Sequence, residues 1–314
     1  MLKEIAHRFS INLIKVPAVG DSLRDLQTFD AAGAQPILVK TGKGEETLAK
    51  GGLPKNTWIC ENLAEAAQKI ITEYASLKKM LYLRSIIFLI GMWIFTIPFT
   101  LASLLTFPFP ALTRYKFISI WAKTMLYWLR ISCNLNFVVK GEQNIGSTAS
   151  IVLSKHQSAW ETLAFQKIFP PQVWVLKKEL LWVPFFGWGL AMTSPIAINR
   201  KAGRKSLEQI LTQGLDRLKK GFWIVMFPEG TRTHPGQKGK YHIGGAWVAS
   251  KTNTQVIPVA HNAGLFWPKN SILKKPGTIQ VSIGEAIDVK NKNPDEIIRL
   301  TENWIEKEVL HLND

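Results

Sequence analysis

The chain has 314 residues, 46% of them hydrophobic, and a formal net charge of +16. This length leaves room for two domains with cores of their own. The positive charge favours anionic partners, and because the basic residues stand among long apolar runs and tryptophans, a membrane surface is favoured over nucleic acid. The two cysteines, Cys60 and Cys133, are too few for a disulfide framework or a metal cluster, and they indicate a reducing, cytosol-facing compartment.

Residues 1–75 have the pattern of a small α/β unit. Alternating short strands and helices are typical of parallel βαβ units. The predicted strands are Ile11–Val19, Pro36–Val39 and Thr57–Cys60, and the predicted helices are Leu23–Ala32 and Leu63–Tyr74.

The middle of the chain is strongly apolar. No residue from Ser85 to Thr113 is charged, and this run is long enough to cross a hydrocarbon core. Proline removes a backbone donor, so Pro98, Pro108 and Pro110 are expected to kink or end the helix. Basic residues flank both sides, so the positive-inside rule gives no orientation. A hairpin with both ends in the cytosol and a second helix at Phe117–Ile131 explains this symmetry. A buried helix of a soluble protein is the alternative.

From Asn134 onward the pattern is again α/β. One helix is predicted near Arg204–Lys220, where leucine and isoleucine recur at helical spacing up to Gly221, and a last helix begins near Pro294. The predicted strands are Ile151–Ser154, Val173–Leu176, Pro195–Asn199, Phe222–Phe227, Val256–Ala260 and Ile279–Ile283.

A histidine and a carboxylate follow the first of these strands in the sequence SKHQSAWET. His156 stands at the strand end, and Glu161 falls in the first turn of the next helix. A neutral imidazole suits a base that takes the proton of a hydroxyl as it attacks a thioester. A carboxylate behind the imidazole fixes its tautomer and stabilises the imidazolium. Ser158 and Glu161 also fit a helix capping box, and this segment alone does not separate the two interpretations.

The segment FPEGTRT follows another apolar strand. Pro228 ends the strand, and Gly230 allows the backbone to approach a ligand closely. Arg232 then projects from a strand-end loop, where a guanidinium can bind a phosphate through two parallel hydrogen bonds. An ordinary turn with a solvated arginine is the alternative.

Five segments occur in an order typical of one family: SKHQSAWE, KKELLWVPFFGWGL, AINR, FPEGTR and VIPVAHNAG. Together they resemble the motif series of the glycerophosphate acyltransferase superfamily over roughly residues 80–290, most of all its bacterial members that acylate 1-acylglycerol-3-phosphate (lysophosphatidic acid). The resemblance implies transfer of a fatty acyl group from acyl carrier protein or coenzyme A to the sn-2 hydroxyl, which gives phosphatidic acid for phospholipid synthesis. It implies no required cofactor and no metal, and a hairpin embedded in the inner (cytoplasmic) membrane with the active site facing the cytosol.

The resemblance also assigns roles to single residues. His156 is the base and Glu161 the carboxylate that orients it, although the family usually has aspartate there, which puts the His–carboxylate geometry in question. Lys177 and Arg232 hold the acceptor phosphate. The remaining assignments are Arg200 to a further substrate-binding motif, Glu229 and Gly230 to the shape of the site beside Arg232, and Pro258 to the acyl-donor site.

A second resemblance covers Val19–Glu45, which is similar to the C-terminal third of haloacid-dehalogenase-type phosphatases, most of all those acting on heptose 1,7-bisphosphate. There the Gly-Asp-x-x-x-Asp element, here Gly20, Asp21 and Asp25, helps hold Mg²⁺. The chemistry also needs an aspartate nucleophile near the start of the domain, and no aspartate precedes Asp21. Residues 1–75 are therefore expected to be a truncated, vestigial phosphatase fragment, in which a working phosphatase is disfavoured.

The expected architecture is α/β. It has a truncated, incomplete Rossmann-like fragment at 1–75, a membrane-associated two-helix hairpin at 80–132, and an acyltransferase domain at 133–314 with a mixed sheet flanked by helices. Acylation of another lyso-lipid and a non-catalytic lipid-binding role remain as alternatives. A single cleft that contains His156 and Arg232 and opens towards the hairpin would favour the enzyme.

Overall fold

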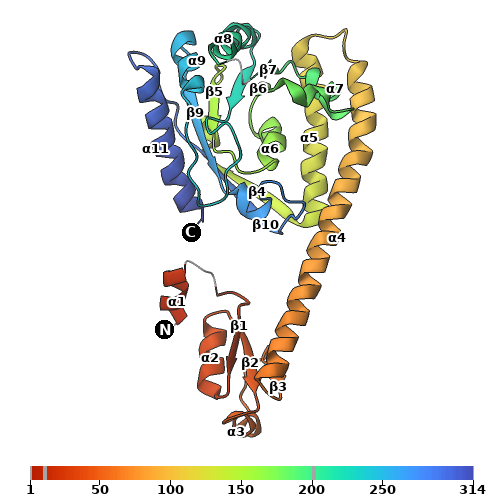
Figure 1. The fold of residues 1–314 in the computed structure, drawn as a ribbon, viewed down its shortest axis with the longest axis vertical. Helices are drawn as coiled ribbons and strands as arrows, with labels where there is room; N and C mark the ends of the chain where they lie inside the picture. Colours follow the sequence, from red (N-terminus) through yellow and green to blue (C-terminus); the bar gives the residue numbers. More distant parts are fainter. Residues whose placement is uncertain (1, 10–12, 200–202, 314) are drawn as a thin grey trace. The chain divides into compact units, whose positions relative to one another are not determined.

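The computed structural model describes residues 2–9, 13–199 and 203–313. The chain divides into two compact units, Met1–Met80 and Leu81–Asp314 (Figure 1). Each unit is described by itself below. Helix α4 (Leu63–Leu104) begins in the first unit and ends in the second.

The first unit is a three-stranded parallel sheet in the order β1-β2-β3. The central strand carries the buried Ile37 and Leu38. The predicted strand at Ile11–Val19 is wrong in its extent, because Lys15 adopts a left-handed conformation with φ 61° and the strand begins only at Pro17; residues 10–12 lie outside the described residues. The elements are α1 (Leu2–Phe9), β1 (Pro17–Gly20), α2 (Leu23–Ala31), β2 (Gln35–Val39), α3 (Gly44–Lys50) and β3 (Trp58–Cys60).

The second unit is built on a seven-stranded sheet in the order β4-β10-β9-β5-β8-β6-β7. The pair β9–β10 is antiparallel and the other pairs are parallel. The predicted mixed sheet is therefore confirmed, with β4 added to it. The strands are β4 (Leu135–Lys140), β5 (Ile151–Ser154), β6 (Gln172–Lys177), β7 (Ile196–Ile198), β8 (Trp223–Met226), β9 (Val256–His261) and β10 (Gly277–Ile283).

Helices cover both faces of this sheet (Figure 1). Side chains alternate along a strand, so Val152 of β5 packs into a cluster with α5 and α6, while Ile151 and Leu153 join a second cluster with α8, α9 and α11. The helices and 3₁₀ turns are α5 (Ala111–Cys133), η1 (Glu142–Asn144), α6 (Trp160–Ile168), η2 (Lys178–Trp182), α7 (Phe186–Ala191), α8 (Arg204–Lys219), α9 (Gly244–Thr252), α10 (Ala263–Phe266) and α11 (Pro294–Asn313).

Helices α4 and α5 form the hairpin. The expected separate helix at Leu63–Tyr74 is instead the first part of α4, which continues through Pro98 and ends before Pro108. Within the hairpin, a Cβ on Gly91 would lie 2.1 Å from Nε1 of Trp128, so glycine allows the two helices to approach closely. The indole N–H of Trp128 donates to the carbonyl of Phe88 at 3.3 Å.

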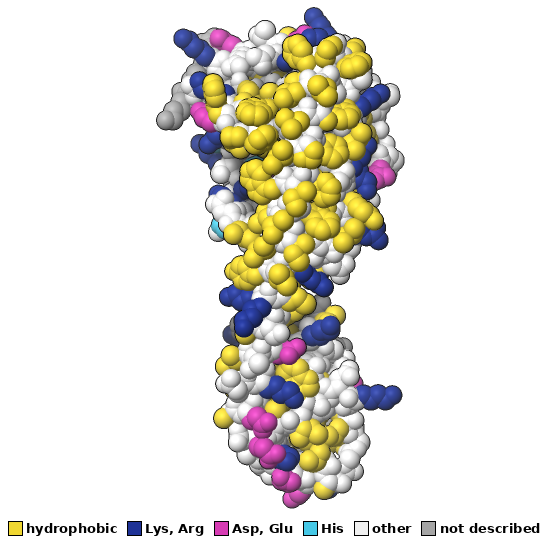
Figure 2. Space-filling model, turned by 90° about the vertical axis from the view of Figure 1, so that its right-hand side faces the viewer, with side chains coloured by type: hydrophobic (Ala, Val, Ile, Leu, Met, Phe, Trp, Pro, Cys, Tyr) yellow, Lys and Arg dark blue, Asp and Glu magenta, His cyan; other side chains and the backbone are white. Residues whose placement is uncertain are grey.

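Much of the hairpin surface is apolar and exposed. Among the described helices, α4 alone is long and apolar enough to cross a membrane, and 28% of its most apolar window is buried. A core helix of a soluble protein would be mostly buried. Figure 2 shows hydrophobic side chains gathered over the face of the second unit that carries α4 and α5. Exposed members on α4 include Ile86, Ile90, Trp93, Ile94 and Leu101.

Candidate active site

His156 and Glu161 meet directly. Nδ1 of His156 lies 2.8 Å from Oε1 of Glu161, and the Glu161 side chain is completely buried. His156 follows the end of β5 and Glu161 is the second residue of α6. The tight connection between strand and helix therefore turns the two side chains towards one another.

The same carboxylate oxygen also caps the helix. Oε1 of Glu161 accepts hydrogen bonds from the backbone N–H groups of Gln157 at 3.1 Å and Ser158 at 2.9 Å. The capping and catalytic interpretations of this motif are therefore compatible, because one oxygen serves both contacts.

Electrostatics set the tautomer of His156. Burial raises the pKa of the Glu161 carboxyl, but the imidazoles of His261 and His156 and the hydrogen bonds it accepts outweigh burial and hold the pKa below its ordinary value. An ionised carboxylate has no proton to donate, so Nδ1 of His156 is the donor in this contact. In the neutral imidazole with this tautomer, the other ring nitrogen, Nε2, carries a lone pair that can take a proton.

The backbone of His156 is held by the loop after β8. Its N–H donates to Oε1 of Glu229 at 3.1 Å. Its carbonyl accepts hydrogen bonds from Thr233, at 2.8 Å from the backbone N and 3.2 Å from Oγ1. Both contacts come from the FPEGTRT segment, so this segment and the histidine are fixed relative to each other.

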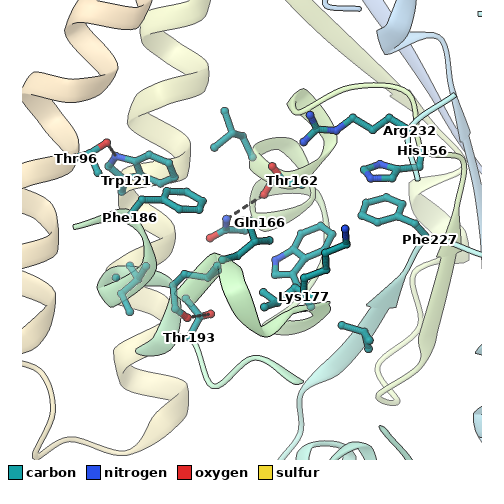
Figure 3. A pocket seen from close by; sticks show the side chains of 18 of the residues that line it. Thr96, Trp121, His156, Thr162, Gln166, Lys177, Phe186, Thr193, Phe227 and Arg232 are labelled. Carbon is teal, nitrogen blue, oxygen red and sulfur yellow. Dashed lines mark hydrogen bonds between the residues drawn. The ribbon is translucent and has the colours of Figure 1, made fainter. Parts of the chain in front are cut away.

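A cavity of about 540 Å³ opens in front of His156. The sheet, α6, η2 and α7 line it on one side, and α4 and α5 line it on the other. In Figure 3 the side chains of His156, Lys177 and Arg232 lie at one end, and those of Trp121 and Phe186 lie at the opposite, apolar end. The cavity thus has a cationic end beside the histidine and an apolar end beside the hairpin, as the acyltransferase interpretation expects.

An aromatic ring covers one face of the histidine. The ring of Phe227 stacks on His156 with centroids 3.9 Å apart and planes 11° apart. Trp174 stacks on Phe227 with centroids 5.7 Å apart, and both rings line the cavity. The imidazole is therefore held by its carboxylate at Nδ1 and by Phe227 on one face of the ring.

Two of the three predicted phosphate-binding residues line the cavity, and so does Gly230, which was assigned to the shape of the site. Lys177 ends β6 and lines the cavity with Arg232. Gly230 also lines it and has φ +67°, a conformation that L side chains rarely adopt. Arg200 lies outside the described residues.

Two other assigned residues do not line this cavity. Glu229 is buried behind it and bonds the His156 backbone. Pro258 lies in β9 beside β5 and borders a different depression with Ile283 and Trp304. The structure therefore gives Glu229 a supporting position and leaves Pro258 apart from the cationic end.

The described residues contain no group of three or more His, Cys, Asp or Glu side chains placed to hold a metal ion. In the first unit, Oδ2 of Asp21 accepts from the N–H of Lys43 at 3.1 Å. Oδ2 of Asp25 accepts from the hydroxyl of Ser22 at 2.7 Å. Both carboxylates thus take part in local loop and helix-start contacts.

Sequence reasoning missed one residue next to the site. Lys155 immediately precedes His156, is 1% exposed, and pairs with both Glu229 and Glu306. The available signal was a lysine directly after a strand of three apolar residues and a serine, where a buried charge needs a partner. Its partner on α11 is 151 residues away in sequence.

Comparisons with known proteins agree with this fold. The Acyltransferase family profile matches residues 136–262. The crystal structure of the 1-acyl-sn-glycerophosphate (LPA) acyltransferase of Thermotoga maritima matches with a TM-score of 0.62, covering 73% of this chain and 95% of that chain at 23% identity. The second unit therefore has the fold of an acyltransferase.

Sequence relatives narrow this class. The 1-acyl-sn-glycerol-3-phosphate acyltransferase of Pseudomonas aeruginosa is 42% identical over 222 residues, which are 69% of this chain and 85% of that protein. The enzyme of the same description from Saccharomyces cerevisiae is 29% identical over 191 residues, 57% of this chain and 60% of that protein. The chain belongs to the 1-acyl-sn-glycerol-3-phosphate acyltransferase family and is an enzyme, as the first resemblance predicted.

The first unit has different relatives. The HAD-hydrolase-like family profile matches residues 1–66. The D-glycero-beta-D-manno-heptose-1,7-bisphosphate 7-phosphatase of Bordetella bronchiseptica is 53% identical over 73 residues, 23% of this chain and 41% of that protein. The chain spans about two fifths of the length of this relative. The second resemblance is confirmed as a separate phosphatase-like fragment.

Proposed function

We propose that this chain transfers a fatty acyl group from a thioester of acyl carrier protein or coenzyme A to the sn-2 hydroxyl of 1-acylglycerol-3-phosphate, giving phosphatidic acid. The observation that carries the proposal is the 2.8 Å contact between Nδ1 of His156 and Glu161 at the cationic end of a cavity with an apolar far end. The phosphate of such a substrate matches the cationic end, its hydroxyl matches the His156–Glu161 pair, and its hydrocarbon chain matches the apolar end.

His156 acts as the general base. Its Nε2 takes the hydroxyl proton while the hydroxyl oxygen attacks the carbonyl carbon of the thioester. When the carbon–sulfur bond breaks, the imidazolium returns that proton to the departing thiolate. Glu161 keeps the imidazole in the required tautomer and stabilises its charged form. The nucleophile is the substrate's own hydroxyl, so the chain needs to supply none.

Arg232 and Lys177 bind the acceptor phosphate. Both line the cavity near His156 (Figure 3). A guanidinium can bind two phosphate oxygens at once, and an ammonium adds a second positive charge. We assign Arg200 to the same phosphate, Gly230 to the close approach of the loop, and Pro258 to the acyl-donor site, as the family resemblance suggests.

The membrane supplies the acceptor. We propose that residues 80–132 embed as a hairpin in the inner membrane with the active site facing the cytosol, that residues 133–314 form the catalytic domain, and that residues 1–75 are a vestigial phosphatase fragment. The exposed apolar face of α4 and the basic residues Lys78, Lys79 and Arg84 before its apolar run support this placement. Apolar residues of α4 and α5, such as Phe99 and Trp121, line the cavity on the hairpin side, and we propose that the lipid enters from there.

Purified full-length protein in detergent tests the proposal. Lysophosphatidic acid and a panel of other lyso-lipids are offered with acyl carrier protein and coenzyme A thioesters, and His156→Ala is run beside the wild type. We expect the wild type to prefer lysophosphatidic acid. Preference for a lyso-lipid without the terminal phosphate would show that lysophosphatidic acid is not the natural acceptor. Absence of turnover with any acceptor would indicate a lipid-binding role.

A further inference from the structure

The lysine before the proposed base is buried and fully paired. Nζ of Lys155 lies 2.8 Å from Oε1 of Glu306, 3.2 Å from Oε2 of Glu229 and 3.2 Å from the carbonyl oxygen of Gln237. An ammonium has three donors, and each of these contacts takes one. Burying a charge is unfavourable unless it is paired and hydrogen-bonded, so this arrangement specifies where the Lys155 side chain lies.

The partners of Lys155 come from separate parts of the second unit. Lys155 follows β5, Glu229 lies in the loop after β8, and Glu306 lies on α11. The second oxygen of Glu229 accepts from the N–H of His156 at 3.1 Å. The hydroxyl of Tyr241 donates to Oε1 of Glu306 at 2.8 Å. A continuous hydrogen-bonded chain therefore runs from α11 through Lys155 and Glu229 to the backbone of the base.

The Lys155 backbone is fixed as well. Its N–H donates to the carbonyl of Val259 at 3.0 Å. Its carbonyl accepts from the buried His261, whose Nε2 lies 2.9 Å away. Lys155 is thus held by hydrogen bonds at its backbone and at its ammonium group. The position of the ammonium in turn fixes where the Glu229 carboxylate can lie.

We propose that Lys155 is a positioning residue for the transfer. Its ammonium holds Glu229 against the His156 backbone and so sets the place of the base relative to the loop that carries Arg232. The inference rests on the proposed function and adds to it a residue that does not line the cavity. Without the ammonium, the carboxylates of Glu229 and Glu306 would face each other as like charges, and we expect the loop to move away from His156.

The alternative is that Lys155 only neutralises buried carboxylates so that the protein folds. The double variant Lys155→Met/Glu229→Gln separates the two roles. It removes both charges, while the amide oxygen of Gln can still accept from the N–H of His156. A folding role predicts recovery of both thermal stability and activity relative to Lys155→Met. A positioning role predicts recovery of stability alone.

Helix α11 offers a matched pair of variants. Glu306 contacts Lys155 at 2.8 Å, and Glu302, one turn earlier, pairs with the exposed Lys238 at 2.7 Å. Glu306→Gln replaces a buried ion pair by a contact between the Lys155 ammonium and a neutral amide oxygen, and we expect kcat/KM for the acceptor to fall about 10-fold. Glu302→Gln removes a surface ion pair, and we expect a change of at most about twofold.

The full-length variants are purified in detergent, and kcat, the acceptor KM and Tm are measured for each. We expect kcat to fall on the order of 10²-fold in Lys155→Met and in the double variant, with Tm recovered only in the double variant. A double variant with wild-type kcat, or equal effects of the two α11 variants, would overturn the positioning role.

Hydrogen–deuterium exchange provides a readout that does not need turnover. Peptides covering residues 154–158 and 227–233 should exchange faster than in the wild type in Lys155→Met and in the double variant. Their exchange rates should be unchanged in Glu302→Gln. Unchanged exchange in both Lys155 variants would contradict the positioning role even if the wild type were inactive. A wild type without turnover but with the expected exchange would count against the proposed function alone.

Discussion

Oε1 of Glu161 reaches Nδ1 of His156 at 2.8 Å, so the His–carboxylate geometry that the glutamate put in question is formed. Glu161 is the second residue of α6, which begins at Trp160. The side chain of Glu161 then folds back across the first turn, where it also accepts the N–H groups of Gln157 and Ser158. The longer carboxylate therefore keeps its contact with the histidine.

His156→Ala should abolish acyl transfer without unfolding the protein. The loss of a general base lowers the rate by roughly 10²–10⁴-fold. His156 is partly exposed to the cavity, so its removal opens little space in the core. Turnover of lysophosphatidic acid and the circular dichroism spectrum are measured together, with the exposed His311→Ala as the control. Near-normal turnover in His156→Ala would rule out this mechanism.

Arg232→Ala should weaken acceptor binding. Losing a charge-assisted contact to phosphate costs about 1.5–3 kcal/mol, which corresponds to a rise of about 10- to 150-fold in acceptor KM. Arg232→Lys should recover only part of this, because an ammonium cannot make the forked contact. The exposed Arg299→Ala on α11 serves as the charge-matched control. If only the KM of the acyl donor rises, Arg232 contacts the donor and not the acceptor phosphate.

The hairpin should place both of its flanks on the cytosolic side. Single cysteines replace Lys78, before the hairpin, and the exposed Lys140, after it, in a chain whose native Cys60 and Cys133 are changed to serine. We expect a membrane-impermeant thiol reagent to label neither position in intact spheroplasts and both after lysis. Labelling of position 140 alone from outside would show that α4 crosses the membrane and that α5 does not return.

The phosphatase-like fragment should be dispensable for acyl transfer. All residues that line the cavity belong to Leu81–Asp314, and a chain shortened to begin at Lys78 keeps the basic flank and the hairpin. It should turn over lysophosphatidic acid at a rate similar to that of the full chain. A folded, membrane-bound but inactive short chain would show that the fragment contributes to the reaction.

The same fragment should release no phosphate from heptose 1,7-bisphosphate. The carboxylates of Asp21 and Asp25 accept hydrogen bonds from the Lys43 N–H and the Ser22 hydroxyl, and among the described residues no group of three or more His, Cys, Asp or Glu is placed to hold a metal ion. Phosphate release by the full-length protein, measured with and without Mg²⁺, provides the check. Magnesium-dependent release that is lost in Asp21→Asn would show that the fragment is catalytic.

Lys274 should make the free energy of unfolding increase with pH in the alkaline range. Burial lowers the pKa of this lysine from 10.5 to about 8, while its ammonium lies 4.5 Å from the ring of Trp267 and 5.1 Å from that of Phe88. Because the folded pKa is the lower one, the unfolded chain binds more protons between pH 8 and 10.5, and this contribution to stability rises with pH across that window. The expected rise is at most about 3 kcal/mol.

The free energy of unfolding, measured by denaturant titration from pH 7 to 10.5, isolates this effect when Lys274→Met is compared with the wild type. The wild type should gain stability relative to the variant as pH increases. A constant difference between the two proteins across this range would show that the Lys274 pKa is not lowered.

Local sequence patterns predicted much of the fold. The strand Ile151–Ser154 and the helix near Arg204–Lys220 were predicted within a residue of their observed bounds, because strong apolar periodicity and the stop at Gly221 define them locally. Strand β4 was missed, since its only buried residue is Leu135 and it depends on pairing with β10, far along the chain.

The contacts of the candidate site were predictable only in part. The spacing of His156 and Glu161 indicated a contact because one strand–helix connection holds both residues. The pairing of Lys155 with Glu306 was not predictable, because nothing local specifies that α11 returns to the end of β5. Pro98 was expected to kink or end its helix, yet α4 continues through it to Leu104. A proline removes one N–H, and packing against α5 and α7 outweighs that local loss.

The ring of Phe227 lies flat against His156, 3.9 Å between centroids, and this bears on the charged form of the base. In the proposed mechanism, taking the hydroxyl proton turns the imidazole into a cation, and a cation over an aromatic face is attracted by the ring quadrupole. We therefore expect Phe227, at the start of FPEGTR, to stabilise the transient positive charge together with Glu161. Glu161 contacts the imidazole through its Nδ1 atom, and Phe227 contacts it across the face of the ring.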